Sequence, residues 1–340
     1  MIVTTDAYIS GIVCHRFCID NSCGKLSIRQ TKIDNEDNIS LKNILLDAFV
    51  PLNEVYEFVH DIDIDLNVFR KIMGEYWDEE DLLNTSKKIY HHLKAVATHP
   101  KIKSGDLVLA KFEDIQIENS YYEAIGIYKI EQKESFLEID LNNGDVATLK
   151  ILPGITSKNI DKACLVIFTK EAPWIFVIDK NNKDTQYWID DFLHVRQRKD
   201  EYTNTQNVMV MAKNFVTKAL PEQFEVTKAD QIDMLNRSLE FFKEKDTFDI
   251  EDFANEVIGQ PEVIESFNNF KRNYETENDI VIDDNFAISN NAFKKQQRSY
   301  KRVIRLDKKI QIIIAGNRDH VEQGEDEKGK YYKVYYREEE

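Results

Sequence analysis

Residues 106–152, DLVLAKFEDIQIENSYYEAIGIYKIEQKESFLEIDLNNGDVATLKIL, decide the fold class of this chain. Apolar and β-branched residues alternate or run together at 107–112, 121–131, 135–141 and 146–152, a pattern typical of strands. Asn143-Gly144 predicts a two-residue hairpin between the last two segments, because both central positions of a type I′ turn need positive φ. With two further strands predicted at 164–169 and 174–179, we expect an antiparallel sheet of about six strands.

The segments before this region predict further parts of the same domain. Residues 8–19 and 25–33 are rich in apolar and β-branched residues, and residues 21–24 supply turn chemistry, which predicts an opening hairpin. Ser40 is placed to cap a helix over 41–49, and apolar residues at helical spacing predict a second helix over 81–98. Residues 1–185 are therefore predicted to form a mixed α/β domain, an antiparallel sheet with flanking helices.

The middle of the chain is predicted to be helical and acidic. Helical spacing extends over 203–220, 228–245, 250–258 and 261–274, with Thr227 and Asp249 as N-caps. Residues 200–292 hold 20 acidic and 8 basic residues, so this stretch carries a net charge of −12. We interpret residues 186–284 as an acidic helical unit whose charges lie on solvated faces.

Residues 285–340 are predicted to form a basic helix and a short β-meander. The helix is expected over 289–297 and the strands over 302–306, 310–315 and 331–337. An acidic loop over 322–327 is expected to join the last two strands, because it carries two nearby glycines. The whole chain is thus predicted to be an α+β protein of three parts.

Composition limits the functional class. The chain has 340 residues, 42% of them hydrophobic, and a net charge of −16, which excludes a small basic protein that coats DNA by bulk charge. No apolar run approaches the roughly 18 to 20 residues that span a bilayer, and the N-terminus lacks the order of a signal peptide, which predicts a cytoplasmic protein. Four cysteines, Cys14, Cys18, Cys23 and Cys164, are too few for a disulfide scaffold and are predicted to be free thiols.

The charge reverses near the C-terminus. Between Phe293 and Ile310 the chain carries eight cationic side chains and one acid, a local charge of +7, so the rest of the chain sums to −23. Such a patch attracts a phosphate backbone through Coulomb interactions and counterion release. Nucleic acid is therefore a candidate partner, and any contact with it must be local.

Several motifs together resemble one known family. They are Ile12-Val13-Cys14-His15 before a predicted hairpin, YWIDDFLHVRQRK at 187–199, YKRVIRLDKKIQIII at 300–314 and KYYKVYY at 330–336. Their order and spacing resemble the bacterial nucleoid-associated protein family of the NdpA or YejK type over nearly the whole length. The resemblance implies association with the nucleoid, DNA binding and no established enzymatic activity. One departure is that family members carry a glycine with basic residues after the central Phe-Leu, where this chain has His194 and Val195.

Two basic clusters are the candidate nucleic-acid-binding residues. Phosphate contact is predicted for the C-terminal cluster, with Tyr300 close enough to stack on a base. Arg196 and Arg198 lie on one side of an extended segment, which suits a smaller phosphate clamp. The alternative for both clusters is a solvated surface, or neutralisation of the acidic helices in the same chain or a dimer mate. The predicted residues are Lys294, Lys295, Arg298, Lys301, Arg302, Arg305, Arg196, Arg198 and Lys199.

The sequence gives little support for a metal, a cofactor or catalysis. The Cys14, Cys18 and Cys23 cluster lacks the second ligand pair of a structural zinc site, and no nucleotide-binding or hydrolase motif is present. We predict a non-enzymatic protein without cofactor or metal. A protein-interaction adaptor recruited by DNA-processing partners is the main alternative, and a metal-dependent nuclease using Glu123, Glu138 and Asp140 is a third. Homo-oligomerisation and the choice between single- and double-stranded DNA are left open.

Overall fold

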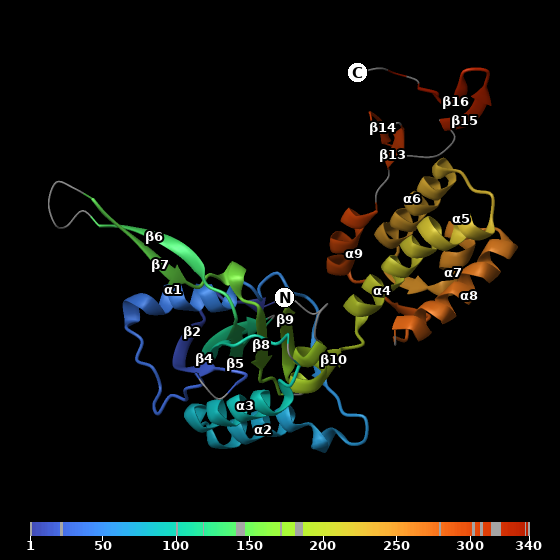
Figure 1. The fold of residues 1–340 in the computed structure, drawn as a ribbon. Helices are drawn as coiled ribbons and strands as arrows, with labels where there is room; N and C mark the ends of the chain where they lie inside the picture. Colours follow the sequence, from blue (N-terminus) through green and yellow to red (C-terminus); the bar gives the residue numbers. More distant parts are fainter. Residues whose placement is uncertain are drawn as a thin grey trace. The chain divides into compact units, whose positions relative to one another are not determined.

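A computed structural model of the protein confirms a mixed α+β fold (Figure 1). The chain forms two compact units, Met1–Arg198 and Lys199–Glu340. The predicted division into three parts stays a prediction. The residues that the structure describes are 2–20, 23–99, 101–117, 119–140, 147–170, 172–180, 186–278, 280–300, 303–306, 309–313, 321–336 and 338.

The first unit is built on an eight-stranded sheet in which every pair of neighbours is antiparallel. The spatial order is β1-β4-β5-β8-β9-β3-β10, and β2 pairs with the same strand, β4, as β1 does. The strands are β1 (Ile2–Val3), β2 (Tyr8–Phe17), β3 (Tyr56–Phe58), β4 (Gly105–Ile117), β5 (Ser120–Ile130), β8 (Lys162–Ile167), β9 (Trp174–Asp179) and β10 (Val195–Gln197).

Helices cover both faces of this sheet (Figure 1). Along β4, Leu107 and Leu109 face a core shared with α2 (Val68–Glu79) and α3 (Leu82–Val96). The alternate residues Val108, Ala110 and Phe112 face a second core, to which α1 (Asn35–Leu46) contributes Leu45 and Leu46. Because both faces are buried, the central strands read as nearly continuous apolar runs.

Two of the predicted strands do not join the main sheet. β6 (Glu134–Asp140) and β7 (Thr148–Gly154) pair only with each other, and their ladder extends away from the sheet (Figure 1). Leu137 and Ile139 lie opposite Ile151 and Leu149 on one face of this ladder, and the four side chains are 56–67% exposed. The predicted Asn143-Gly144 turn lies outside the described residues.

The N-terminal predictions need three corrections. Residues 25–33 do not form a strand in the part described. The backbone of this segment meets that of β2 at the isolated bridge between Arg16 and Lys25 and at the bond from Thr31 N to Ile12 O, while Ser27 bonds to Cys14 O and His15 Nδ1. The helix predicted over 41–49 begins earlier, after Asp34, and Ser40 lies inside it. Helix α2 was not predicted, and Asn67 caps it by accepting from Arg70 N. Helix α3 begins after Asp81, close to its predicted start.

The second unit holds the acidic helices. Thr227 and Asp249 act as N-caps, as predicted, because their side chains accept hydrogen bonds from first-turn amides. The core is rich in phenylalanine, with Phe242 and Phe248 stacked at 5.7 Å. Its elements are α4 (Glu201–Asn214), a π-helical turn (Phe215–Ala219), α5 (Leu220–Gln223), α6 (Lys228–Glu244), β11 (Thr247–Asp249), α7 (Ile250–Phe253), a second π-helical turn (Ala254–Ile258), α8 (Pro261–Asn278), β12 (Asn285–Ala287) and α9 (Asn290–Gln296).

The C-terminal strands form two short ladders, β13 (Val303–Leu306) with β14 (Ile310–Ile313) and β15 (Val321–Asp326) with β16 (Gly329–Val334). Ile304 and Val321 pack against Ile232 of α6. The loop predicted over 322–327 is wrong, since most of it is β15. Most side chains of β15 are polar, so the strand lacks the apolar alternation that predicts strands. One of them, Gln323, accepts a hydrogen bond at its Oε1 from Tyr332 Oη of β16 at 3.2 Å.

Candidate nucleic-acid interface

Helix α9, which carries the first predicted cations, is fixed firmly to α4. Ser289 caps it by accepting from Ala292 N, and Ser289 N donates to Thr205 Oγ1 at 3.0 Å. Ala292 is fully buried and Phe293 packs against the core of the second unit. These contacts direct the opposite side of α9 to solvent.

Three predicted cations are exposed at the C-terminal end of α9. Lys294 and Lys295 occupy the last turn of α9, and Arg298 lies in the following 3₁₀ turn, Gln297–Ser299. All three side chains are exposed, and neither Lys294 nor Arg298 forms an ion pair with any described residue. Lys295 Nζ lies 5.8 Å from the centre of the Tyr202 ring. Cations near a helix C-terminus are favoured by the helix dipole, so this placement needs no acidic partner.

Lys213, a fourth cation, was not identified from the sequence. It lies in the last turn of α4, and its Nζ donates to Ser299 Oγ at 3.2 Å, next to Arg298. Helical spacing places Lys213 off the buried side of α4, but only the packing of α9 on α4 shows that it adjoins the basic cluster. We call Lys213, Lys294, Lys295 and Arg298 the C-terminal basic surface.

The prediction that Tyr300 stacks on a base is wrong. Its side chain is 4% exposed and its hydroxyl donates to Met209 O at 2.7 Å. Burial raises the pKa of this phenol. Tyr300 is therefore part of the core of the second unit.

The other C-terminal cations are not shown to join the C-terminal basic surface. Arg305 is exposed on β13, a strand that packs against α6, and Lys309 is exposed just before β14. Lys301 and Arg302 lie outside the described residues, so their predicted phosphate contacts stay predictions.

The second predicted cluster is divided between the two units and is partly engaged. Arg196 lies opposite Glu57 in the ladder of β10 and β3, and its Nε is 3.0 Å from Glu57 Oε1. Arg198 is half-buried and donates to Pro173 O at 3.1 Å. Lys199 is exposed at the start of the second unit. Two of the three cations thus bind groups of their own unit.

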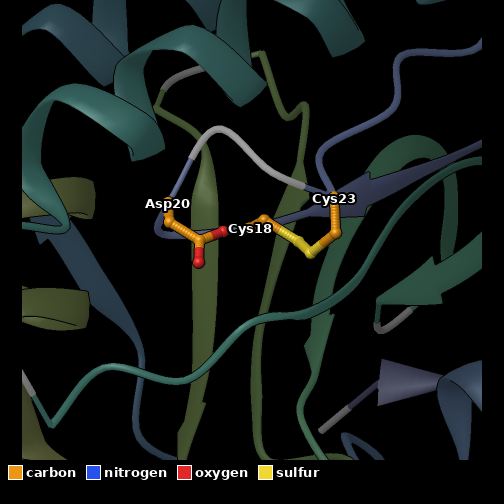
Figure 2. Close-up of side chains that lie close together, drawn as sticks. All are labelled: Cys18, Asp20 and Cys23. Atoms are coloured by element: carbon orange, nitrogen blue, oxygen red, sulfur yellow. A yellow bond between two sulfur atoms is a disulfide. The ribbon is translucent and has the colours of Figure 1, made fainter.

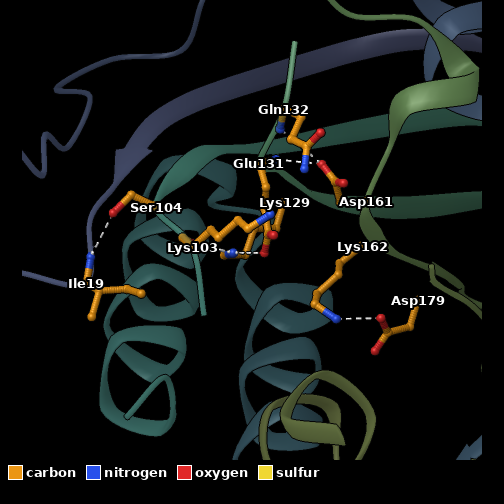
Figure 3. A network of polar contacts seen from close by, with 9 residues as sticks. All are labelled: Ile19, Lys103, Ser104, Lys129, Glu131, Gln132, Asp161, Lys162 and Asp179. Atoms are coloured by element: carbon orange, nitrogen blue, oxygen red, sulfur yellow. Dashed lines mark hydrogen bonds and ion pairs between the residues drawn. The ribbon is translucent and has the colours of Figure 1, made fainter. Parts of the chain in front are cut away.

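Two other cations of the first unit, Lys129 and Lys162, are fully buried (Figure 3). Lys129 donates to Lys103 O at 2.7 Å and pairs with Glu131, while Lys162 pairs with Asp179. Asp161 accepts hydrogen bonds from the backbone amides of Glu131 and Gln132. The two lysines are thus paired with carboxylates inside the first unit and are not available to a phosphate backbone.

The match to a protein family decides the identity of the chain. The family model described as nucleoid-associated protein YejK matches residues 19–328. The chain belongs to this family. The match includes the motifs at 187–199 and 300–314, whereas Ile12-Val13-Cys14-His15 and the motif at 330–336 lie outside it. No curated protein matches the sequence. Membership supports a nucleoid-associated role and a nucleoid location, and the YejK family is not known as an enzyme family.

Position 194, where family members were expected to carry a glycine, adopts a conformation that suits one. His194 has φ 51° and ψ 60°, the left-handed region that most side chains avoid. Asn67 Nδ2 donates to His194 O at 2.8 Å, and the His60 ring stacks on the His194 ring at 5.1 Å. The turn therefore forms without glycine, at a cost that these contacts offset.

The prediction of free thiols is wrong for two of the four cysteines (Figure 2). Cys18 and Cys23 form a disulfide, since the turn after β2 brings their Cα atoms to 5.7 Å, within the usual range. Cys14 and Cys164 are free thiols, as predicted, the first exposed and the second buried. Asp20 lies close to the two paired sulfurs, and with both thiols in a disulfide this group lacks thiolate ligands.

The carboxylates of the nuclease alternative are not brought together. Glu123 of β5 pairs with Lys111, and Glu138 of β6 pairs with Lys150 in the projecting ladder. Across the described part of the chain, Cys18, Asp20 and Cys23 are the one group of three or more potential ligands whose ligand atoms lie close together, and its two sulfurs are bonded to each other. Among the described helices, none combines the length and apolar character of a bilayer-spanning helix.

Proposed function

We propose that this YejK-family protein contacts the phosphates of nucleoid DNA directly, through its C-terminal basic surface. The observation that carries the proposal is that Lys294 and Arg298 are exposed and free of ion pairs with the described residues, in a chain of net charge −16. Cations without acidic partners can release counterions from DNA, whereas paired cations such as Arg196 must first give up a carboxylate. Arg305, Lys199, Lys301 and Arg302 are proposed as secondary contacts.

The contact is proposed to be independent of base sequence. Tyr300 is buried and supplies no stacking surface. Contacts to phosphates position a protein on DNA without reading its sequence. We propose no catalytic step, because the YejK family is not known as an enzyme family.

The test is a fluorescence-anisotropy titration of a labelled duplex with the full chain, at about 50 and 200 mM salt. The test variant changes Lys294, Lys295 and Arg298 to Gln. The control variant changes Arg237, Lys243 and Lys245 of the second unit to Gln, which removes the same charge from α6 and the residue that follows it. We expect the slope of log affinity against log salt to fall by about 2.7 in the test variant, because each phosphate that is no longer neutralised reduces the slope by about 0.9.

Equal slopes in the two variants would show that the contact lies elsewhere. No salt-sensitive binding of the unchanged protein at low salt would overturn direct contact and favour the adaptor alternative. That alternative has support in the exposed acids of α7 and α8, including Glu251, Glu262 and Glu265, which could dock a basic partner. A fluorescent fusion that still localises to the nucleoid, with no DNA binding in vitro, would support the adaptor.

A further inference from the structure

A pocket of about 430 Å³ opens in the first unit between α2 and the sheet. Met73, Gly74 and Trp77 of α2 form one wall, and Phe58, Val166 and Phe168 form the other. We call it the Trp77 pocket. Its volume lies in the range of sites that bind small molecules or single side chains, and its walls are mostly carbon.

Trp77 is an apolar wall left open to water. Its side chain is 52% exposed and stacks on Phe168, with ring centres 4.9 Å apart and planes 30° from parallel. Phe168 in turn lies 5.9 Å from the ring of Tyr76, which is buried in the core. The indole is therefore held rigidly by its neighbours while one side remains available to a ligand.

Gly74 keeps the same wall open. A glycine in a helix interior destabilises the helix relative to alanine. Here a Cβ built on Gly74 would meet no atom within 4 Å, so no close packing requires a glycine. What its missing side chain provides is room, next to Trp77 and one turn from Arg70.

The rim of the pocket is positively charged. Arg70, Lys71 and Lys170 line it, and no acidic residue does so among the described residues. Lys71 and Lys170 are exposed and form no ion pair with a described residue. Arg70 pairs with Asp65 at 2.7 Å, but both side chains are largely exposed, so a competing carboxylate can replace Asp65. The rim therefore favours an anionic ligand.

We propose that the Trp77 pocket binds an acidic peptide segment of a partner protein. One aromatic or branched aliphatic side chain of the peptide enters beside Trp77 and Gly74, and flanking carboxylates pair with Lys71 and Lys170. A nucleobase fits the walls less well, because their one hydroxyl, Thr169 Oγ1, already donates to Ala172 O at 2.6 Å. Among the described lining residues no other side chain carries an oxygen, so the N–H groups of a base edge would find few acceptors, whereas the cations of the rim pair readily with carboxylates. This proposal is independent of DNA contact by the second unit.

The experiment uses the full chain and a set of short dye-labelled peptides. Each peptide carries the same acidic flanks and differs only in its central residue, which is Phe, Trp, Leu or Ser, and labelled oligothymidine is titrated in parallel. We expect the apolar central residues to bind at least about tenfold more tightly than Ser. Lys71→Glu with Lys170→Glu should abolish the binding, whereas Lys32→Glu with Lys158→Glu, elsewhere on the same unit, should not.

Position 74 supplies the matched pair of variants. Gly74→Leu should fill the pocket and weaken peptide binding at least about tenfold, while Gly74→Ala adds one methyl group and should leave it nearly unchanged. Thermal unfolding followed by tryptophan fluorescence checks that both variants fold. The proposal is overturned if no peptide binds below about 1 mM, if Gly74→Leu binds as well as Gly74→Ala, or if oligothymidine alone binds and this binding disappears in Gly74→Leu.

Discussion

Two sets of cations, one in each unit, lie in opposite environments. In the first unit Lys129 and Lys162 are 0% and 2% exposed and are bound to Glu131 and Asp179. In the second unit Lys294, Lys295 and Arg298 of the C-terminal basic surface are exposed at the end of α9, which packs on α4. Buried lysines serve the fold and exposed ones remain available to a ligand. Net charge alone therefore cannot locate a binding surface.

The buried lysines show how strongly an environment can change a cation. Lys129 and Lys162 lie opposite each other in the ladder of β5 and β8, and Lys162 lies opposite Asp179 in the next ladder. Burial lowers the pKa of Lys129, and the charge of Glu131 opposes that shift. Each cation is kept beneath the sheet by a specific carboxylate, because an unpaired buried charge is very costly.

The largest expected effect would come from breaking one of these pairs. Lys162→Met removes the ion pair between Lys162 and Asp179 and leaves the carboxylate buried, so it should lower the free energy of unfolding by about 3–5 kcal/mol. Adding Asp179→Leu should restore most of the loss. Urea unfolding followed by tryptophan fluorescence measures this in the first unit alone, since Trp77, Trp174 and Trp188 all lie there. A loss below about 1 kcal/mol would show that the pair is not important for stability.

A smaller effect is expected on the pH dependence of the stability of the first unit. His15 is 3% exposed, and burial lowers its pKa below the usual 6.5, as do nearby Lys87 and His91 to a lesser extent. Because unfolded His15 gains a proton below about pH 6.5 that the folded form resists, the first unit should lose stability as pH falls below that value. The slope is at most about 1.4 kcal/mol per pH unit for one proton.

The variant His15→Gln tests the source of that pH dependence. It removes the titrating group, so its tryptophan-detected unfolding should change less between pH 7.5 and 5.5 than that of the unchanged protein, although its stability is lower at both. Equal pH dependence in the two proteins would assign the effect to other groups, such as His92, whose pKa burial also lowers.

The smallest effect is expected for an exposed pair of the first unit. Arg196 is 64% exposed beside Glu57, so Arg196→Ala should cost less than about 1 kcal/mol of stability. It should also change DNA affinity less than Arg298→Ala does, because Arg298 forms no ion pair with a described residue that DNA binding would have to break. Anisotropy titrations of the two single variants decide this, and a larger effect of Arg196→Ala would reverse the contrast between the units.

Hydrophobic periodicity predicted the elements that have one regularly buried face. Helices α3 and α6 and strands β4, β5, β8 and β9 were expected close to where they lie, because each places apolar side chains on a buried face. Strand β15 was missed because its side chains are mostly polar and exposed. Helix α2 was missed although its buried residues Phe69, Ile72, Met73 and Tyr76 recur at helical spacing, so this signal was present in the sequence.

The candidate site was predicted in part, and for a physical reason. The exposure of Lys294, Lys295 and Arg298 follows from helical spacing, which turns Ala292 and Phe293 inward. Tyr300 could not be placed by the same argument, because its burial depends on a hydrogen bond to Met209, distant in sequence. The proximity of Lys213 is likewise a tertiary contact, invisible in local pattern.

Local unfolding should cost less free energy in the ladder of β6 and β7 than in the rest of the first unit. A two-stranded ladder that rests on no third strand can separate without disturbing the main sheet, so its amides should exchange with solvent hydrogen long before those of β5 or β8. Its exposed aliphatic face, Leu137, Ile139, Leu149 and Ile151, gains most from being covered. Local exchange rates in this ladder are thus a sensitive indicator of whether another surface has come to rest on it.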